Sequence, residues 1–180
     1  GYIFKSKPVK ENLISDMNAS IRHRGPDDEG FHKDKVLNKY IGLGMTRLSI
    51  IDLASGKQPI YSQDKSLVIV FNGEIYNYQS LKIELETNHK TEFKTNSDTE
   101  VILKMYEIYG VESFSKLDGM FAFSILDKNI GKVFIARDFF GEKPLYYSKQ
   151  MDRIIWGSEL KSLMLNFESK PTINKEAMSL

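Results

Sequence analysis

The spacing of apolar residues divides the chain into short strands and amphipathic helices. Apolar residues at every second position, or in short unbroken runs, are typical of strands, whereas a spacing of three or four residues is typical of helices. The pattern predicts strands at 1–4, around Phe31, and at 41–47, 67–71, 119–126, 132–136, 144–147 and 153–156. It predicts helices at 13–21, 78–85, 97–109 and 158–165, a charged turn at 33–39 and a loop at 54–59.

The order of these elements favours two antiparallel sheets packed face to face. Helices and strands come in separate groups, and the links between strands have the length of hairpins. The strand predicted at 119–126 is apolar on both faces, which is typical of a sheet that is covered on both sides. We therefore expect an α+β domain with its sheets inside and its helices outside.

The apolar run 67–71 is followed at once by Asn72, Gly73 and Glu74. An Asn-Gly pair after a strand is typical of a hairpin turn, because both residues adopt positive φ at low cost. The residues that follow, 74–78, do not alternate like a returning strand, so the turn is also expected to present its own groups. A side-chain amide beside an unhindered backbone N–H has the composition of an oxyanion hole.

Two charged residues are candidates for contacts with a ligand. Strand alternation places Arg47 on the apolar face of the strand 41–47, where a charge needs a partner. That partner is a carboxylate of the fold or a ligand carboxylate held by the guanidinium fork, unless a bend turns the side chain outward. Asp98 lies in the capping box Ser97-Asp98-Thr99-Glu100, where the helix dipole alone also favours an acid.

Composition limits the classes of partner. The chain has 180 residues, of which 25 are basic and 24 acidic, and 41% are hydrophobic, which fits one domain with a sizeable core. The balanced charge, without a basic run, argues against nucleic acid. No apolar run approaches the roughly 20 residues that span a bilayer, so we expect a cytoplasmic protein with no membrane partner. Without cysteine, these residues contain no disulfide, thiolate metal site or cysteine nucleophile.

Five motifs follow one another along the chain. They are Arg22-His23-Arg24-Gly25-Pro26-Asp27, Arg47-Leu48-Ser49-Ile50-Ile51-Asp52, Asn72-Gly73-Glu74-Ile75-Tyr76-Asn77, Ser97-Asp98-Thr99-Glu100 and Ala136-Arg137-Asp138-Phe139-Phe140-Gly141-Glu142-Lys143-Pro144-Leu145-Tyr146-Tyr147. Together they resemble the glutaminase domain of glutamine-hydrolysing asparagine synthetases, a class II glutamine amidotransferase. The resemblance covers nearly the whole chain and implies the N-terminal-nucleophile hydrolase fold, a four-layer αββα sandwich.

The resemblance also implies a chemistry. In this family an N-terminal Cys attacks the side-chain amide of L-glutamine, ammonia leaves, and water clears the thioester. The resemblance assigns the Asn72 amide and the Gly73 N–H to the oxyanion, Arg47 to the α-carboxylate of glutamine and Asp98 to its α-ammonium group. The other residues that it assigns to the glutamine site are Leu48, Ser49, Ile50, Ile51 and Glu74.

Two further pairs in these motifs are interpreted as structural. His23 and Arg24 are expected to hold a loop through charged hydrogen bonds. Arg137 and Asp138 are expected to form a buried pair that supports the domain.

The chain departs from the family pattern in its missing nucleophile, because Gly1 aligns with a glycine a few residues after the family's Cys. As written, the fragment is expected to be inactive. We expect residues 1–170 to form the glutaminase domain, with no cofactor or metal of its own, and residues 171–180 to begin a linker towards a synthetase domain that uses Mg-ATP. A catalytically silent glutamine-binding domain, a glutaminase that serves another acceptor, and a homodimer are left open.

Overall fold

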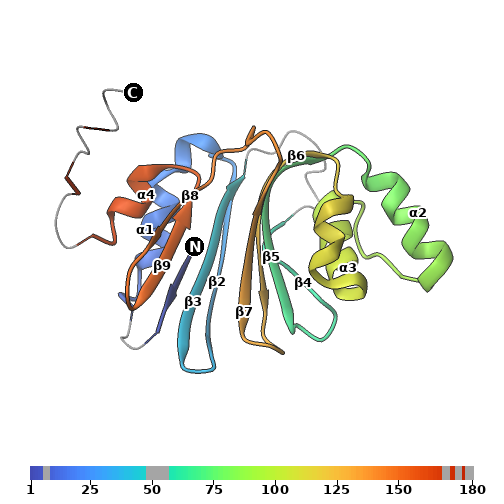
Figure 1. Cartoon of the computed structure of the whole chain (residues 1–180), viewed down its shortest axis with the longest axis horizontal. Helices are drawn as coiled ribbons and strands as arrows, with labels where there is room; N and C mark the ends of the chain where they lie inside the picture. The colour runs from blue at the N-terminus through green and yellow to red at the C-terminus, as the bar shows by residue number, and fades with distance from the viewer. Residues whose placement is uncertain (6–8, 48–56, 168–170, 173–175, 177–180) are drawn as a thin grey trace.

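Two antiparallel sheets lie face to face, with helices on both outer sides. The computed structural model describes residues 1–5, 9–47, 57–167, 171–172 and 176. Helices α1 and α4 lie beside one sheet, whereas α2 and α3 lie beside the other (Figure 1). This arrangement confirms the predicted αββα sandwich.

The first sheet has five strands in the order β2-β3-β1-β9-β8. They are β1 (Tyr2–Phe4), β2 (Asp28–Val36), β3 (Lys39–Arg47), β8 (Tyr146–Lys149) and β9 (Arg153–Gly157). The short strand β1 lies in the middle, with Ile3 opposite Ile41 of β3 and Ile154 of β9. The outer face of this first sheet is covered by α1 (Leu13–Ser20) and α4 (Leu160–Met164). The 3₁₀ turn η1 (Arg22–Arg24) follows α1.

The second sheet has four strands in the order β4-β5-β6-β7. They are β4 (Ile60–Tyr61), β5 (Leu67–Ile75), β6 (Gly119–Asp127) and β7 (Lys132–Arg137). Its outer face packs against α2 (Tyr78–His89), α3 (Asp98–Tyr109) and the 3₁₀ segment η2 (Gly110–Lys116). The central strand of this sheet, β5, is therefore covered on both faces.

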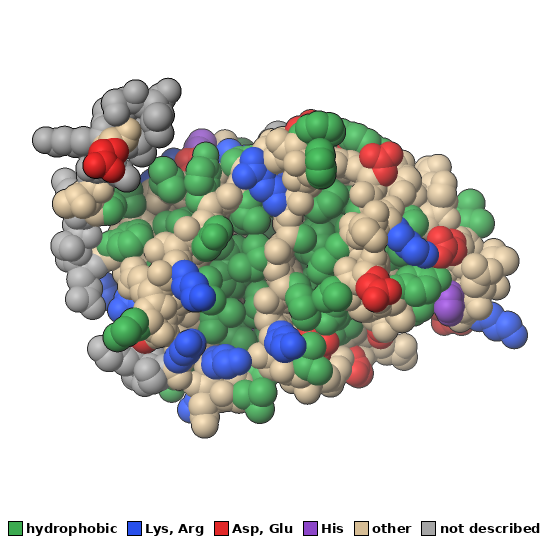
Figure 2. Space-filling view, in the orientation of Figure 1, with side chains coloured by type: hydrophobic (Ala, Val, Ile, Leu, Met, Phe, Trp, Pro, Cys, Tyr) green, Lys and Arg blue, Asp and Glu red, His purple; other side chains and the backbone are tan. Residues whose placement is uncertain are grey.

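Alternation along β5 explains its continuous apolar run. Leu67, Ile69 and Phe71 belong to the cluster beneath the helices, whereas Val68 and Val70 belong to the cluster between the sheets. Each such side chain contributes about 1.5–3 kcal/mol through burial, so the strand is anchored on both sides. Figure 2 shows apolar side chains in the middle of this face of the molecule, over the seam between the two sheets.

The predicted charged turn at 33–39 is wrong in its extent. Strand β2 runs to Val36, and the reversal is confined to Leu37 and Asn38, which have φ of 47° and 61°. Exposure alternates along this segment because successive side chains of a strand point to opposite faces. The charges are tolerated because β2 is an edge strand.

The predicted turn at Asn72-Gly73 is also wrong. Strand β5 does not end at Phe71 but continues to Ile75, and its pairing with β6 runs without a break to Gly119. Gly73, with φ of 147°, lies where a Cβ atom would overlap Met120 O, so the absence of a side chain lets the two strands stay paired there.

Candidate functional site

The candidate site begins at one edge of β5. In an antiparallel sheet the N–H groups of successive residues point to alternate edges, and the odd-numbered residues of β5 point away from β6. At the start of β5, the Leu67 N–H donates to Ser62 Oγ at 2.9 Å, and Ile69 pairs with Ile60 of β4. Further along, the Phe71 N–H donates to Gln58 Oε1 at 2.7 Å, and the Ile75 N–H donates to Asp98 Oδ2 at 3.1 Å.

Gly73 is the remaining odd-numbered residue on this edge. Its N–H lies between those of Phe71 and Ile75, and within the described part of the chain it has no side-chain or loop acceptor. Both neighbours are held by side chains, so the strand cannot easily shift to close the gap. The edge therefore presents one open backbone donor at a fixed position.

Asn72 lies on the face of β5 that is turned toward the other sheet. Its side chain points to the same face of β5 as that of Val70, which is buried between the sheets, but the Asn72 side chain is exposed. It lines a cavity of about 110 Å³ between the sheets, together with Gly1, Gly44, Thr46 and other residues. The Asn72 side chain therefore lines this cavity, and the Gly73 N–H follows it directly in the chain, on the edge of β5.

The start of α3 supplies the acidic residue of the site. The Ser97 side chain caps the helix by accepting from the Thr99 N–H at 3.2 Å, as the capping motif predicts. The reciprocal half of the capping box is absent, because Glu100 accepts instead from the N–H groups of Lys94 and Thr95. This contact holds the preceding loop and leaves Asp98 directed at β5.

Burial raises the pKa of the Asp98 carboxyl above its ordinary value, and the nearby charge of Glu74 raises it further. Hydrogen bonds from the N–H groups of Ile75 and Thr99 and from the Thr99 hydroxyl act in the opposite direction but do not cancel the effect. A carboxylate in this position is stabilised by a cation. The end of β5 is therefore a suitable place for an ammonium group.

Arg47 comes from the opposite sheet. It ends β3 opposite Asp28, is partly exposed, and its carbonyl accepts from the Asp27 N–H at 3.2 Å. The preceding residue, Thr46, lines the same cavity as Asn72. The predicted glutamine contacts Leu48, Ser49, Ile50 and Ile51 lie outside the described residues.

A charged cluster lies beside the cavity. Glu159 Oε1 accepts from His23 Nε2 at 2.8 Å and from Arg24 Nη1 at 3.4 Å, while Lys161 lies 3.1 Å from Glu159 Oε2. These contacts confirm that His23 and Arg24 hold their loop through charged hydrogen bonds. Burial by itself raises the pKa of Glu159, but the hydrogen bonds from Lys161 and His23 together outweigh burial and lower this pKa below its ordinary value.

Comparison with known proteins identifies the family. A model of the glutamine amidotransferase domain matches residues 1–180. The chain belongs to the glutamine amidotransferase domain family. This amidotransferase domain is 48% identical over 181 residues to asparagine synthetase [glutamine-hydrolyzing] 1 of Bacillus subtilis, which covers 98% of the chain and 28% of that protein. It is 41% identical over 197 residues to a putative asparagine synthetase 2 of Methanocaldococcus jannaschii, which covers 100% of the chain and 38% of that protein.

A solved structure supports the fold of the amidotransferase domain. Glutamine phosphoribosylpyrophosphate amidotransferase from B. subtilis, complexed with ADP and GMP, superposes with a TM-score of 0.70 at 22% sequence identity. The superposition covers 91% of this chain and 42% of that one. The two chains therefore share the αββα fold expected from the motifs.

The amidotransferase domain brings together Asn72, Gly73, Glu74 and Asp98. Gln58, which contacts the same edge, was missed because a glutamine in a loop belongs to no periodic pattern and to no catalytic motif considered from the sequence. The expected buried pair of Arg137 and Asp138 is wrong.

In place of that pair, the two side chains hold one turn separately. Asp138 is buried and accepts from the N–H groups of Phe121, Glu142 and Lys143. Arg137 is exposed and donates to Gly141 O at 2.6 Å.

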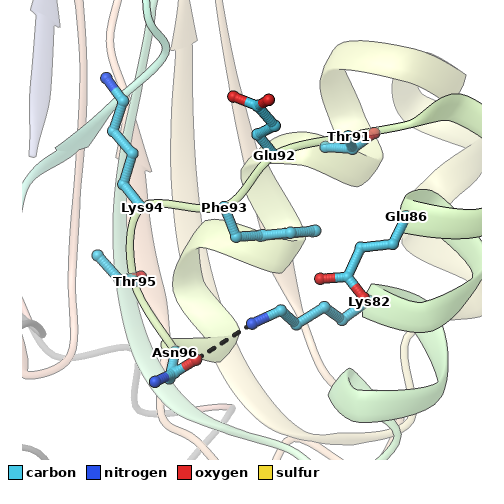
Figure 3. A pocket seen from close by; sticks show the side chains of 8 residues that line it. All are labelled: Lys82, Glu86, Thr91, Glu92, Phe93, Lys94, Thr95 and Asn96. Carbon is cyan, nitrogen blue, oxygen red and sulfur yellow. Dashed lines mark hydrogen bonds between the residues drawn. The ribbon is translucent and has the colours of Figure 1, made fainter.

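A second and larger hollow of the amidotransferase domain is lined by none of the residues of the candidate site. It is an open groove of about 510 Å³ between α2 and the loop before α3. Figure 3 shows Lys82 reaching across it to Asn96, with a distance of 3.1 Å between Lys82 Nζ and Asn96 Oδ1. Lys82 also lies 5.0 Å from the ring centre of Phe93, so the groove is bridged by its own side chains.

The described residues hold neither a cluster of candidate metal ligands nor a membrane-spanning helix. They contain no group of three or more histidine, aspartate and glutamate side chains that could hold a metal ion. None of the helices in the same ranges is long and apolar enough to cross a membrane.

Proposed function

We propose that this domain hydrolyses L-glutamine to glutamate and ammonia, and that a synthetase domain of the same protein uses the ammonia to make asparagine. The open Gly73 N–H beside the Asn72 amide is the observation that carries the proposal. Two fixed donors side by side suit an oxygen that becomes negatively charged during attack on an amide. Relatives named glutamine-hydrolysing asparagine synthetases support the same conclusion.

The reaction proceeds through a covalent intermediate. A cysteine thiolate attacks the γ-carbonyl carbon of glutamine, and the carbonyl oxygen takes up the negative charge between Asn72 Nδ2 and Gly73 N. The carbon–nitrogen bond then breaks, and the nitrogen takes up the proton that the cysteine thiol lost when it became a thiolate and leaves as ammonia. Water attacks the thioester, which releases glutamate and returns the thiol.

The strand register supports the proposed position of this nucleophile. Strand β1 pairs Tyr2 with Gly42 of β3 and with Ile155 of β9, and the Gly1 nitrogen donates to Trp156 O at 2.8 Å. Continued by four residues, the same register runs opposite 44–47 of β3 and through the cavity that reaches Asn72. A cysteine a few residues before Gly1 would therefore arrive beside the proposed oxyanion donors.

Charged groups at the two ends of the substrate complete the proposal. Asp98, with Glu74 nearby, receives the α-ammonium group of glutamine, because both charges favour a cation there. Arg47 receives the α-carboxylate, since its fork binds a carboxylate through two parallel hydrogen bonds. The segment Leu48, Ser49, Ile50 and Ile51 surrounds the rest of the substrate.

The activity of the whole protein is part of the proposal. The chain spans 28%, 23% and 38% of the length of three curated relatives that it matches. We assign the Mg-ATP-dependent step to a synthetase domain that follows residue 170, and no cofactor to the glutaminase domain. Measured glutamine turnover separates this proposal from a silent glutamine-binding domain, and the identity of the amidated product separates it from an enzyme that serves another acceptor.

The test is Asn72→Ala in the full-length protein, with Asn129→Ala, an exposed asparagine in the β6–β7 turn, as the matched control. Loss of one oxyanion donor lowers glutamine turnover by about 10² to 10³. Synthesis driven by free ammonia is expected to stay at the wild-type rate in both variants. An equal loss of the glutamine-driven and ammonia-driven rates in Asn72→Ala would contradict the oxyanion role.

A further inference from the structure

We propose that Gln58 is a positioning residue, whose side chain holds the open edge of β5 and ties it to the start of α3. The inference extends the proposed glutaminase function, on which its effect on catalysis rests. The hydrogen bonds that define the role of Gln58 can be tested separately from turnover.

The contacts of Gln58 belong to a closed series of hydrogen bonds. The Phe71 N–H donates to Gln58 Oε1 at 2.7 Å, and Gln58 Nε2 donates to Thr99 Oγ1 at 3.4 Å. The Thr99 hydroxyl donates to Asp98 Oδ1 at 3.5 Å, and Asp98 Oδ2 accepts from the Ile75 N–H at 3.1 Å. Both ends of the series lie on β5, on either side of residues 72–74.

The two hydrogen bonds to β5 are shorter than the two bonds that link the side chains. Contacts of 3.4 and 3.5 Å are at the long limit for hydrogen bonds, so the bond from Phe71 to Gln58 is the main anchor on that side. Gly73 N–H lies between this anchor and the anchor at Ile75. The direction of the open donor therefore depends on both.

Gln58 replaces a missing strand at this point. The pairing of β4 with β5 covers Val68 and Ile69 but does not reach Phe71, so a side chain takes the place of a backbone acceptor. The main chain of Gln58 is itself packed against the other sheet, because its carbonyl lies against Gly30 of β2 where a Cβ atom would overlap it. A packed residue of this kind can transmit its position to β5.

Glutamine suits both partners because it has one acceptor and one donor end. Glutamate at this position would keep an acceptor for the Phe71 N–H but would not donate to Thr99. Methionine has a similar length and offers neither hydrogen bond of the amide. These two substitutions separate the anchor on β5 from the link to α3.

The other end of β5 provides a matched control. Ser62 is buried, and its Oγ accepts from the Leu67 N–H at 2.9 Å on the same edge of the strand. Ser62→Ala removes a contact of the same kind but leaves Phe71 and Gly73 with their own surroundings. A purely structural contribution of edge contacts would affect both variants alike.

The kinetic test compares Gln58→Met, Gln58→Glu and Ser62→Ala in the full-length protein. We expect Gln58→Met to lower kcat for glutamine hydrolysis by about ten- to a hundredfold, because small displacements of a catalytic donor have effects of this order. KM is expected to change less than kcat, Gln58→Glu to recover most of the lost kcat, and Ser62→Ala to leave kcat at the wild-type value. Equal values of kcat in Gln58→Met and Ser62→Ala, or a failure of Gln58→Glu to exceed Gln58→Met, would overturn the proposal.

Hydrogen exchange of the full-length protein tests the same role without turnover. In Gln58→Met, exchange of the amides at 71–75 is expected to become faster than in the wild type, while in Ser62→Ala the increase is confined to the region of Leu67. Unchanged exchange at 71–75 in Gln58→Met would overturn the positioning role. If the two variants show these exchange changes but the wild-type protein does not hydrolyse glutamine, the positioning role stands and the proposed function is refuted.

Discussion

The two halves of β5 differ sharply although they belong to one strand and share the partner β6. The first half, 67–71, is buried on both faces, and its edge N–H groups are taken by Ser62, β4 and Gln58. The second half, 72–75, is mostly exposed up to Ile75, and its edge carries the open Gly73 N–H.

This difference shows how a fixed donor can be kept unpaired. An unpaired N–H in a mobile segment would turn to water or to another acceptor. Here the apolar half anchors the strand in two cores, and the bond from Ile75 to Asp98 holds its far end. The polar half is held between these two fixed points, which suits donors that act without rearrangement.

Among the substitutions in β5, Gly73→Ala is expected to have the largest effect on glutamine turnover. Its Cβ would overlap Met120 O and crowd Phe121 Cα, at a φ that alanine rarely adopts. We expect glutamine turnover to fall by more than about 10³, because the donor pair is displaced as a unit. Gly110→Ala is the control, since Gly110 also has positive φ but nothing lies within 4 Å of a Cβ there. Full glutamine turnover in Gly73→Ala would show that the edge of β5 plays no part.

The buried half is tested by Ile69→Ala. This side chain is fully buried beneath the helices, so its truncation is expected to lower the free energy of unfolding by about 2–5 kcal/mol. Ile83→Ala on the exposed surface of α2 is the control, and we expect it to change the same quantity by less than about 0.5 kcal/mol. Denaturant titration provides the measurement. Similar values for the two variants would mean that this half of β5 is not the anchor.

Arg47→Lys addresses the contribution of the opposite sheet. A lysine keeps the charge but cannot form the two parallel hydrogen bonds of a guanidinium group. We expect the KM for glutamine to rise by roughly tenfold, equivalent to about 1.4 kcal/mol, with a smaller change in kcat. Arg137→Lys, at the exposed end of β7, is the control. An unchanged KM in steady-state kinetics would show that Arg47 has a structural role and does not bind the α-carboxylate of glutamine.

The smallest expected effect is the change in stability with pH caused by Asp98. Burial raises the pKa of this carboxyl in the folded protein, so the folded state holds the proton more tightly than the unfolded state does. Ionisation of Asp98 therefore reduces stability as the pH rises from the ordinary aspartate pKa of about 3.9 through the raised value.

Asp98→Asn should then have a higher Tm than the wild type at pH 7, while binding glutamine more weakly. The difference in Tm should shrink as the pH falls below about 3.9, where the wild-type carboxyl is protonated in both states. Thermal melts between acidic and neutral pH measure this trend. A lower Tm for Asp98→Asn at pH 7 would show that the ionised carboxylate stabilises the fold.

Periodic signals made much of the fold predictable from the sequence. The run 67–71 could be assigned to a covered strand, and Ser97 to a helix cap, because both depend on local spacing. The continuation of β5 through Asn72 and Gly73 was missed because Asn-Gly has a strong local turn preference, which the long-range pairing with β6 overrides.

The candidate site was less predictable for a similar reason. Asp98 and the Asn72-Gly73 pair came from motifs, but neither their common edge nor the open donor can be read from residue spacing. Gln58 acts through a contact with a strand that begins nine residues later, and no periodic pattern marks such a contact.

The most direct test of the account is a crystal structure of the full-length protein with L-glutamate, the proposed product. We expect one γ-carboxylate oxygen to lie about 2.7–3.1 Å from both Gly73 N and Asn72 Nδ2, with the α-ammonium group at Asp98. Glutamate bound away from β5, for example in the groove between Lys82 and Asn96, would contradict it.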